Sequence, residues 1–278
     1  MKIRTILFPT DFSVNAENAM EYAVQLADRY KASLLLFHSF HMPVIRTDVP
    51  LEEMEKQVDL AEKEAKKKLQ QMQQSIQKKF PDLSSMIVVR RGFTVENIIN
   101  LLDEQYIDMI VMGTKGASGI KEIVLGSITG DVIAKAECPV LAIPEDAKYR
   151  PFKNMAYAVD HNNPDCEPLS YLVKLALSFD AEAKLVSVLE DGDIQNDKIK
   201  EELKSKVAEQ VNYASIKVEI VSDKDVLHGI NKYVEENHPD LLVMATRKKS
   251  LLDKLFKGSL TKKMAFHTHL PLLALHSS

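Results

Sequence analysis

A stretch of glycines after an apolar run has the residue types and spacing of a phosphate-binding loop. Residues 108–112 are DMIVM, and the following residues fit the pattern G-x2-G-x9-G-S with Gly113, Gly116, Gly126 and Ser127. Gly113 permits a sharp turn because glycine adopts positive φ without steric cost, and Gly116 leaves main-chain N–H groups open to an anion. Gly126 and Ser127 begin a helical stretch, and the start of a helix binds anions through unpaired N–H groups. The spacing predicts a phosphate site, although a plain turn followed by a helix that Ser127 caps explains the same residues.

Polar residues also follow the first apolar run of the chain, where residues 9–13 read PTDFS. Asp11 can accept a hydrogen bond from an adenine amino group, or it can cap the helix that begins near Asn15. The sequence leaves both roles open. It contains no G-x-x-x-x-G-K-[ST] loop, no G-x-G-x-x-G after the first run and no S-G-G-x-D-S-like loop. Any nucleotide site is therefore of another type than these three.

The chain repeats itself, because residues 108–142 align with residues 240–274 without a gap. The starts of the two halves also correspond, ILFPTD at residues 6–11 matching MAYAVD at residues 155–160. Identical pairs in the longer alignment include Asp108/Asp240, Val111/Val243, Met112/Met244, Thr114/Thr246, Ser118/Ser250, Gly126/Gly258, Ser127/Ser259, Thr129/Thr261 and Pro139/Pro271. We predict a duplication with one domain over residues 1–146 and a second over residues 152–278, joined by a polar segment.

The second copy has lost part of the glycine pattern. Ala245 replaces Gly113 and Lys248 replaces Gly116, whereas the Gly-Ser pair persists. We predict that the second half binds no ATP or binds it more weakly. Because the second copy dispenses with these glycines, their presence in the first half indicates a role beyond folding. The second half also carries a run of basic residues near these positions. This run could attract an anion other than ATP, or it could form a solvated surface. It comprises Arg247, Lys248, Lys249, Lys254, Lys257, Lys262 and Lys263.

Strands and helices alternate around these motifs. In the first half, residues 3–8, 33–37, 86–90, 109–112 and 140–143 form short runs rich in Ile, Val and Leu, as buried parallel strands do. Helical periodicity covers residues 15–30 and 51–80, and the second half repeats the order from residues 155–159 to 272–275. This alternation predicts an α/β fold in which each half is a five-stranded, parallel, doubly wound sheet. Ligands bind at the carboxyl ends of such strands, where both polar motifs lie.

Composition excludes several classes of protein. The chain has 278 residues, 45% of them hydrophobic and 27% charged, with a net charge of −4. These values are typical of a globular protein and give no reason to expect a nucleic acid or membrane partner. No apolar stretch approaches the roughly 20 residues that span a bilayer. The two cysteines, Cys138 and Cys166, indicate a reducing compartment, so we expect a cytoplasmic protein.

The run ILFPTDFS, the Met112–Gly113 pair and the G-x2-G-x9-G-[ST] pattern together resemble the universal stress protein family. The resemblance covers both halves and implies two tandem Rossmann-like domains of the adenine nucleotide alpha hydrolase-like type. It implies ATP as ligand, or ADP or AMP, with Mg²⁺ or Mn²⁺ carried by the phosphates and no metal ligands from the protein. Ser39 stands where the family often has a branched apolar residue, which a backbone contact tolerates. The implied binding residues are Pro9, Thr10, Asp11 and the Ser39 backbone around adenine, Met112 and Gly113 near the ribose, and Gly116, Gly126, Ser127 and Ile128 at the phosphates.

Three functions are compatible with this sequence. The favoured one is an ATP-binding regulatory protein of the stress response with slow or no hydrolysis. The alternatives are a slow nucleotide phosphohydrolase and a non-catalytic scaffold whose second domain binds another ligand. A fast phosphoryl-transfer enzyme needs positioned cations and metal-binding carboxylates, and near the loop only Lys115, Lys121 and Glu122 are charged. His38 and His41 are more typical of structural or surface residues than of an acid–base pair.

The resemblance also implies how the halves associate. Universal stress proteins pair through their last strands, which here are residues 140–143 and 272–275, each preceded by a proline. Exposed apolar edges of a sheet are normally covered. We therefore expect an intramolecular pseudo-dimer, with a homodimer of whole chains left open.

Overall fold

The computed structural model describes residues 2–41, 50–114, 127–161, 166–189, 196–210, 216–246 and 270–276. Among them, residues 2–140 and 141–276 form two compact units, with the boundary inside strand β5 (Val140–Ile143). The remaining elements of the first unit are β1 (Thr5–Pro9), α1 (Val14–Tyr30), β2 (Ser33–Phe40), α2 (Leu51–Lys79), β3 (Ser85–Arg91), α3 (Thr94–Glu104), β4 (Met109–Gly113) and α4 (Ser127–Lys135). Those of the second are β6 (Asn154–Ala158), α5 (Cys166–Phe179), β7 (Glu182–Leu189), α6 (Asn196–Gln210), β8 (Ile216–Ser222), α7 (Val226–Asn237), β9 (Leu241–Thr246) and β10 (Leu272–His276).

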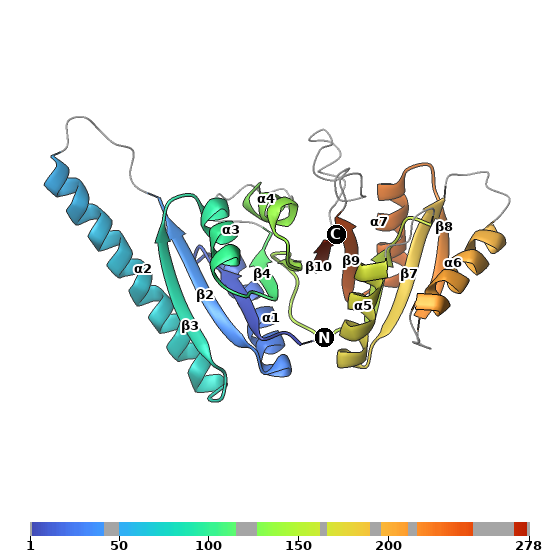
Figure 1. Ribbon diagram of the computed structural model, residues 1–278, viewed down its shortest axis with the longest axis horizontal. Coiled ribbons are helices and arrows are strands. Elements are labelled where there is room, and N and C mark those ends of the chain that lie inside the picture. The colour runs from blue at the N-terminus through green and yellow to red at the C-terminus, as the bar shows by residue number, and fades with distance from the viewer. Residues whose placement is uncertain are drawn as a thin grey trace. The chain divides into compact units, whose positions relative to one another are not determined.

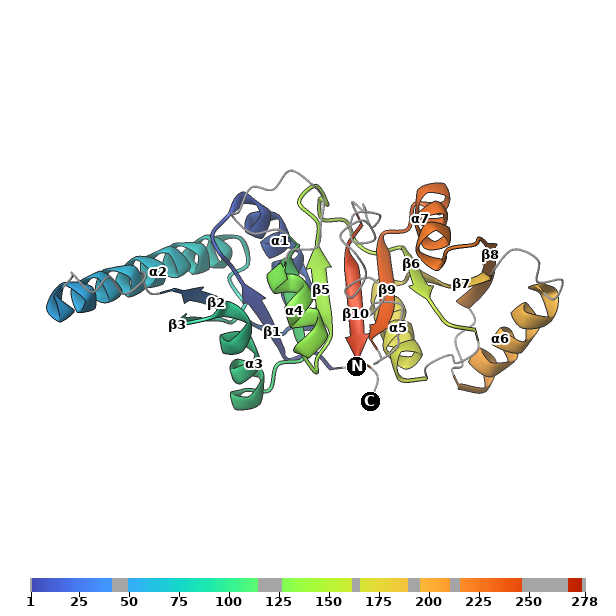
Figure 2. The same cartoon turned by 90° about the horizontal axis from the view of Figure 1, so that it is seen from above.

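Each unit is built on a parallel sheet, so the predicted α/β class is confirmed. The first contains the order β3-β2-β1-β4 and the second the order β10-β9-β6-β7-β8, with parallel pairing throughout both orders (Figure 1). In the first unit α1 and α2 cover one face, and α3 and α4 the other (Figure 2). The strand order reverses between β1 and β4, and again between β6 and β9. In doubly wound sheets a ligand cleft opens at such a reversal.

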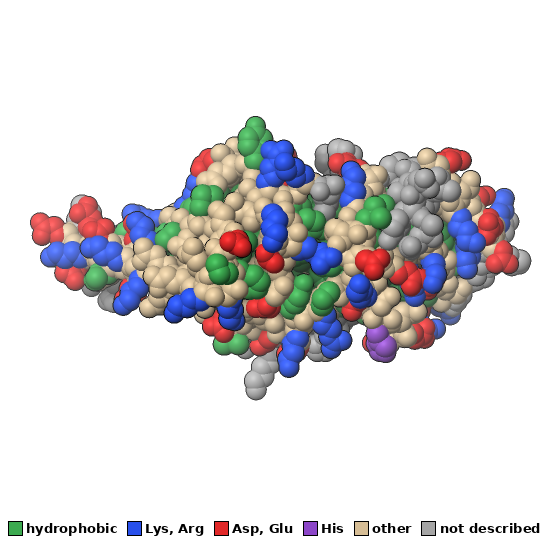
Figure 3. All heavy atoms as spheres, turned by 90° about the horizontal axis from the view of Figure 1, so that it is seen from below, with side chains coloured by type: hydrophobic (Ala, Val, Ile, Leu, Met, Phe, Trp, Pro, Cys, Tyr) green, Lys and Arg blue, Asp and Glu red, His purple; other side chains and the backbone are tan. Residues whose placement is uncertain are grey.

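The strands of the first unit owe their burial to the apolar runs seen in the sequence. The last four residues of β1 are buried, as are all four of β5 at the boundary of the units, which matches the absence of polar alternation. Helix α2 is packed only in part, because Ala65, Leu69 and Ile76 are buried but no described side chain before Ala65 is. Acidic and basic side chains cover its exposed face, at the left of Figure 3.

The duplication is also visible in matching hydrogen bonds at the amino ends of the strands. Asp108 Oδ2 accepts bonds from two consecutive backbone N–H groups at the start of β1, at 2.8 and 2.9 Å. Asp240 Oδ2 does the same at the start of β6, at 2.9 Å for both. The carbonyls of Pro139 and Pro271 accept from backbone N–H groups of β4 and β9 at 2.9 and 3.0 Å. The aspartate and proline that both halves keep therefore hold the fold together.

Candidate functional site

The loop after β1 is held in a fixed shape by short-range bonds. The Thr10 N–H donates to the carbonyl of Phe37 at 2.9 Å, and the Thr10 hydroxyl accepts from the N–H of Phe12 at 3.0 Å. Phe12 has φ of 62°, a left-handed conformation that is uncommon for a residue with a side chain. The hydrogen bond from its N–H to the Thr10 hydroxyl helps to hold that conformation, which turns the loop at the carboxyl end of β1.

The helix cap of α1 is Ser13, whose hydroxyl accepts from the N–H of Ala16 at 3.2 Å. Asp11 instead accepts from the N–H of Ser13 at 3.0 Å and is exposed. Of the two roles that the sequence left open for Asp11, capping α1 directly is therefore taken by Ser13. The Asp11 carboxylate braces the turn and lies at the entrance of the site.

His38 supports this loop from behind. Its Nδ1 lies 2.7 Å from the carbonyl of Thr10, and since a carbonyl only accepts, Nδ1 carries the proton and donates. The ring stacks on Phe12 at 4.4 Å between centroids, and Lys68 Nζ lies 5.2 Å from the Phe12 centroid. Burial lowers the pKa of His38 and outweighs the Thr10 bond and the charge of Asp11, which raise it, while Lys68 lowers it further. His38 is thus a neutral, structural histidine, as its sequence context favoured.

The opposite wall is formed by the end of β4 and the start of α4. The hydroxyl of Thr129 donates to the carbonyl of Gly113 at 2.8 Å and ties the helix to the strand. Ser127 is the first residue of α4 and is exposed. Because a helix N-terminus carries partial positive charge, this wall suits an anionic group. Gly116 and Gly126 lie outside the described residues.

A cavity of about 160 Å³ lies between these two walls. It brings together eight of the ten residues that the sequence singled out, namely Pro9, Thr10, Asp11, Ser39, Met112, Gly113, Ser127 and Ile128. The lining residues that sequence reasoning missed are Ala16, Phe37, Thr94, Thr114 and Thr129. Thr94 begins α3, three residues after the last residue of β3, so inspecting the segment after that strand as well would have found it.

Hydroxyl groups dominate the polar lining. Asp11 carries the one charge among the described residues of the cavity wall. The side chain of Ser39 donates to the carbonyl of Gly92 at 3.3 Å and lies 2.8 Å from the hydroxyl of Thr94. Within the described part of the chain, no group of three His, Cys, Asp or Glu side chains gathers closely enough to hold a metal ion.

The corresponding positions of the second unit differ in chemistry. Ala245 is the next-to-last residue of β9, at the position where Gly113 ends β4. Val188 occupies the sixth place in the β7–β8 ladder, as Ser39 does in the β2–β3 ladder. Val226 begins α7, as Thr94 begins α3. Asp160 still follows β6. Lys248, Gly258 and Ser259 fall outside the described residues.

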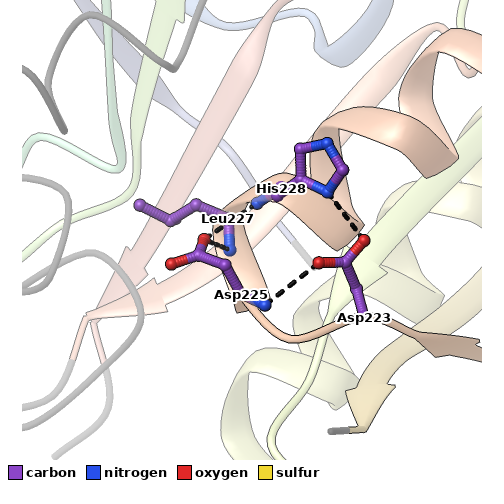
Figure 4. Close-up of polar contacts among 4 residues, drawn as sticks. All are labelled: Asp223, Asp225, Leu227 and His228. Carbon is purple, nitrogen blue, oxygen red and sulfur yellow. Dashed lines mark hydrogen bonds and ion pairs between the residues drawn. The ribbon is translucent and has the colours of Figure 1, made fainter. Parts of the chain in front are cut away.

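The start of α7 has a side-chain cap, unlike that of α3. Asp225 Oδ1 accepts from the N–H groups of Leu227 at 2.9 Å and His228 at 3.0 Å, and Asp223 accepts from the Asp225 N–H at 3.0 Å (Figure 4). Asp223 Oδ2 also pairs with His228 Nδ1 at 2.7 Å. The bond from the Asp225 N–H, followed by that from His228, lowers the pKa of Asp223. The cap residue of α3, Phe93, makes no side-chain cap bond.

Comparison with known proteins gives the same architecture. The family model described as universal stress protein family matches residues 2–144 and again residues 151–276. Universal stress protein MJ0577 of Methanocaldococcus jannaschii is 29% identical over 154 residues, 50% of this chain and 94% of that protein. A universal stress protein structure from Archaeoglobus fulgidus DSM 4304 has a TM-score of 0.73 at 21% identity, covering 99% of this chain and 96% of its own. A universal stress protein solved in complex with cAMP matches 46% of this chain and 100% of its own, at 15% identity and a TM-score of 0.37.

No helix among the described residues is both long and apolar enough to cross a membrane.

Proposed function

The chain belongs to the universal stress protein family, with two of its domains in tandem, and from this premise we propose that the first domain binds ATP, ADP or AMP. The domains extend over residues 1–146 and 152–278. The nucleotide biases the shape or the partner choice of the protein and is hydrolysed slowly or not at all. The second domain binds ATP much more weakly or not at all.

The observation that carries this proposal is the convergence of three separate segments on one cavity. The end of β1 contributes Asp11, the end of β4 contributes Gly113, and the start of α4 contributes Ser127. The α4 terminus suits the phosphates because of its unpaired N–H groups, which leaves the base to the ends of β1, β2 and β3. Mg²⁺ or Mn²⁺ would arrive on the phosphates and neutralise part of their charge.

The regulatory role rests on what surrounds the cavity. Apart from the Asp11 carboxylate, the polar side chains in the described part of the lining are hydroxyls. Those of Ser39, Thr10 and Thr129 are engaged in bonds to the protein. Such groups position a ligand but do not accelerate phosphoryl transfer in the way that fixed cations and metal-binding carboxylates do. An ATP turnover above about 0.1 per second would overturn this part of the proposal, since typical enzymes turn over at roughly 1–1,000 per second.

Isothermal titration with ATP tests the binding claim, with cAMP and AMP in the same panel. We expect one strong ATP site per chain. The Gly116→Lys variant, which copies the second half, should fold normally and lose that site. Its matched control is Lys248→Gly, the reverse exchange at the equivalent position, which should leave the strong site unchanged. Two equivalent ATP sites in the wild-type chain would refute the assignment.

A further inference from the structure

Helix α2 is longer than the connection between β2 and β3 requires. It has 29 residues and a length of about 44 Å, whereas β2 and β3 have eight and seven residues and lengths of about 23–26 Å. The same connection in the second unit, from β7 to β8, contains α6 with 15 residues. In Figures 1 and 2 the first part of α2 stands clear of β2 and β3. We call residues 51–64, which precede the first buried side chain of the helix, the α2 extension.

The α2 extension carries an apolar stripe in line with the buried residues of the same helix. Met54, Val58 and Ala61 follow one another at intervals of four and three residues, and Ala65 comes four residues later. This is the spacing of the a and d positions of a heptad repeat, the residues that face a partner helix in a coiled coil. Ala65 is buried, whereas the three residues of the stripe are each partly exposed. The face that packs the rest of α2 therefore stays accessible along the extension.

The charges of the extension are sorted around this stripe. Successive residues of a helix are separated by about 100° around its axis. Glu55 and Glu62 therefore border the stripe on one side, and Glu64 borders it on the other. The two lysines of the extension, Lys56 and Lys63, lie on the opposite face of the helix. The stripe is thus an apolar surface between acidic borders.

We propose that the α2 extension is the docking site for a basic amphipathic helix of a partner protein, which packs its apolar side on the stripe and places Lys or Arg against the acidic borders. In a coiled coil the residues beside the apolar seam face the partner helix, and their charges set the choice of partner. A second copy of α2 would bring acidic borders against acidic borders, and such like-charge contacts disfavour a wrong partner. This surface is separate from the cavity of the first unit, so docking does not depend on the nucleotide site.

The test titrates the full chain against two labelled synthetic helices and follows fluorescence anisotropy. Both peptides have Ile at a and Leu at d over about three heptads; the Lys peptide has lysine at e and g, and the Glu peptide has glutamate there. We expect the chain to bind the Lys peptide at least about tenfold more tightly than the Glu peptide, with an affinity that falls as salt rises. Val58→Asp should weaken binding of the Lys peptide at least about tenfold, because it removes the central apolar contact. Leu60→Asp is the matched control, since Leu60 is 59% exposed and lies outside the stripe, and it should leave the affinity unchanged.

A second variant tests the acidic borders without touching the stripe. Glu55→Lys/Glu64→Lys exchanges two exposed side chains and should remove the preference for the Lys peptide, while circular dichroism shows an unchanged helix content. Failure of the wild-type chain to bind the Lys peptide, or equal binding of both peptides, would overturn the proposal. Equal effects of Val58→Asp and Leu60→Asp would do the same. Sedimentation velocity covers the remaining occupant, because a wild-type dimer that Val58→Asp dissociates would assign the stripe to a second copy of this chain and refute the basic partner.

Discussion

Replacing Gly229 by alanine should destabilise the second unit, although alanine is the better helix former. Gly229 is buried on α7, and a Cβ atom there would lie 2.6 Å from Cγ1 and 3.1 Å from Cγ2 of Val188, and 3.0 Å from Cβ of Asp223. Optimal contacts between carbon atoms are about 3.5–4.0 Å. The helix or the valine must therefore move by about 1 Å.

The magnitude follows from two opposing effects. Forcing an extra methyl group into a packed interface costs about 1–3 kcal/mol, and the helix propensity of alanine over glycine offsets about 1 kcal/mol. Because the 2.6 Å contact is far below the optimum and involves a branched side chain, we take the upper part of that range, about 2–3 kcal/mol. The expected net loss is then roughly 1–2 kcal/mol in the free energy of unfolding of the second unit. Its cause can be isolated with Val188→Ala, because removing the two Cγ atoms makes room for the new Cβ.

Urea unfolding followed by circular dichroism measures all three variants. In the double variant Val188→Ala/Gly229→Ala, the alanine at 229 should cost little or become stabilising, giving a coupling free energy of about 1 kcal/mol or more. The first unit has the opposite combination of sizes at the corresponding positions. The smaller Ser39 stands on its strand in place of Val188, and the larger Asn97 stands on its helix in place of Gly229. A Gly229→Ala protein as stable as wild type, or strictly additive effects in the double variant, would refute the packing argument.

Two further predictions concern the first unit and its counterpart. Asp108→Ala removes the acceptor of two backbone N–H groups and should lower the free energy of unfolding, measured with urea, by about 1–3 kcal/mol without changing nucleotide affinity. Asp240→Ala should have the same effect on the second unit. An Asp108→Ala protein with unchanged stability and a large change in nucleotide affinity would contradict this. The depressed pKa of His38 means that its unfolded form takes up a proton near pH 6.5 while the folded form does not, so stability should fall as the pH drops below 6.5. NMR titration of the His38 ring should give a midpoint below that of free histidine, and a midpoint above 6.5 would refute the burial argument.

The fold was predictable because its signals are local. The bounds of β5 agree with the sequence pattern at both ends, and β4 differs by one residue. Strand β2 extends to Phe40 instead of ending at Phe37, since the ladder with β3 continues through His38 and Ser39 to Arg91. That extension consists of polar and apolar residues that only pairing with a distant segment makes into a strand.

Eight of the ten residues that the sequence singled out line one cavity, and their role in binding stays a prediction. The sequence did not point to lining residues whose place depends on contacts between elements. Thr94 has no motif around it, and only folding brings it beside Ser39, 55 residues earlier in the chain. Ser39 was assigned a backbone contact, and the contacts of its hydroxyl with Gly92 and Thr94 could not be read from the sequence. The edge-to-edge pairing of the two last strands stays a prediction.

The two halves of the chain share contacts at the amino ends of their sheets and differ at several positions of the cavity wall, and this contrast bears on function. At the amino ends, Asp108 and Asp240 make the same pair of bonds. At the carboxyl ends, the residues that line the first cavity change character, because Gly113 becomes alanine and the positions of Ser39 and Thr94 become valine. The contacts that hold the strands together are thus kept in both halves, whereas the positions of Gly113, Ser39 and Thr94 are not. This is the pattern expected if the first unit keeps a nucleotide site that the second unit has given up.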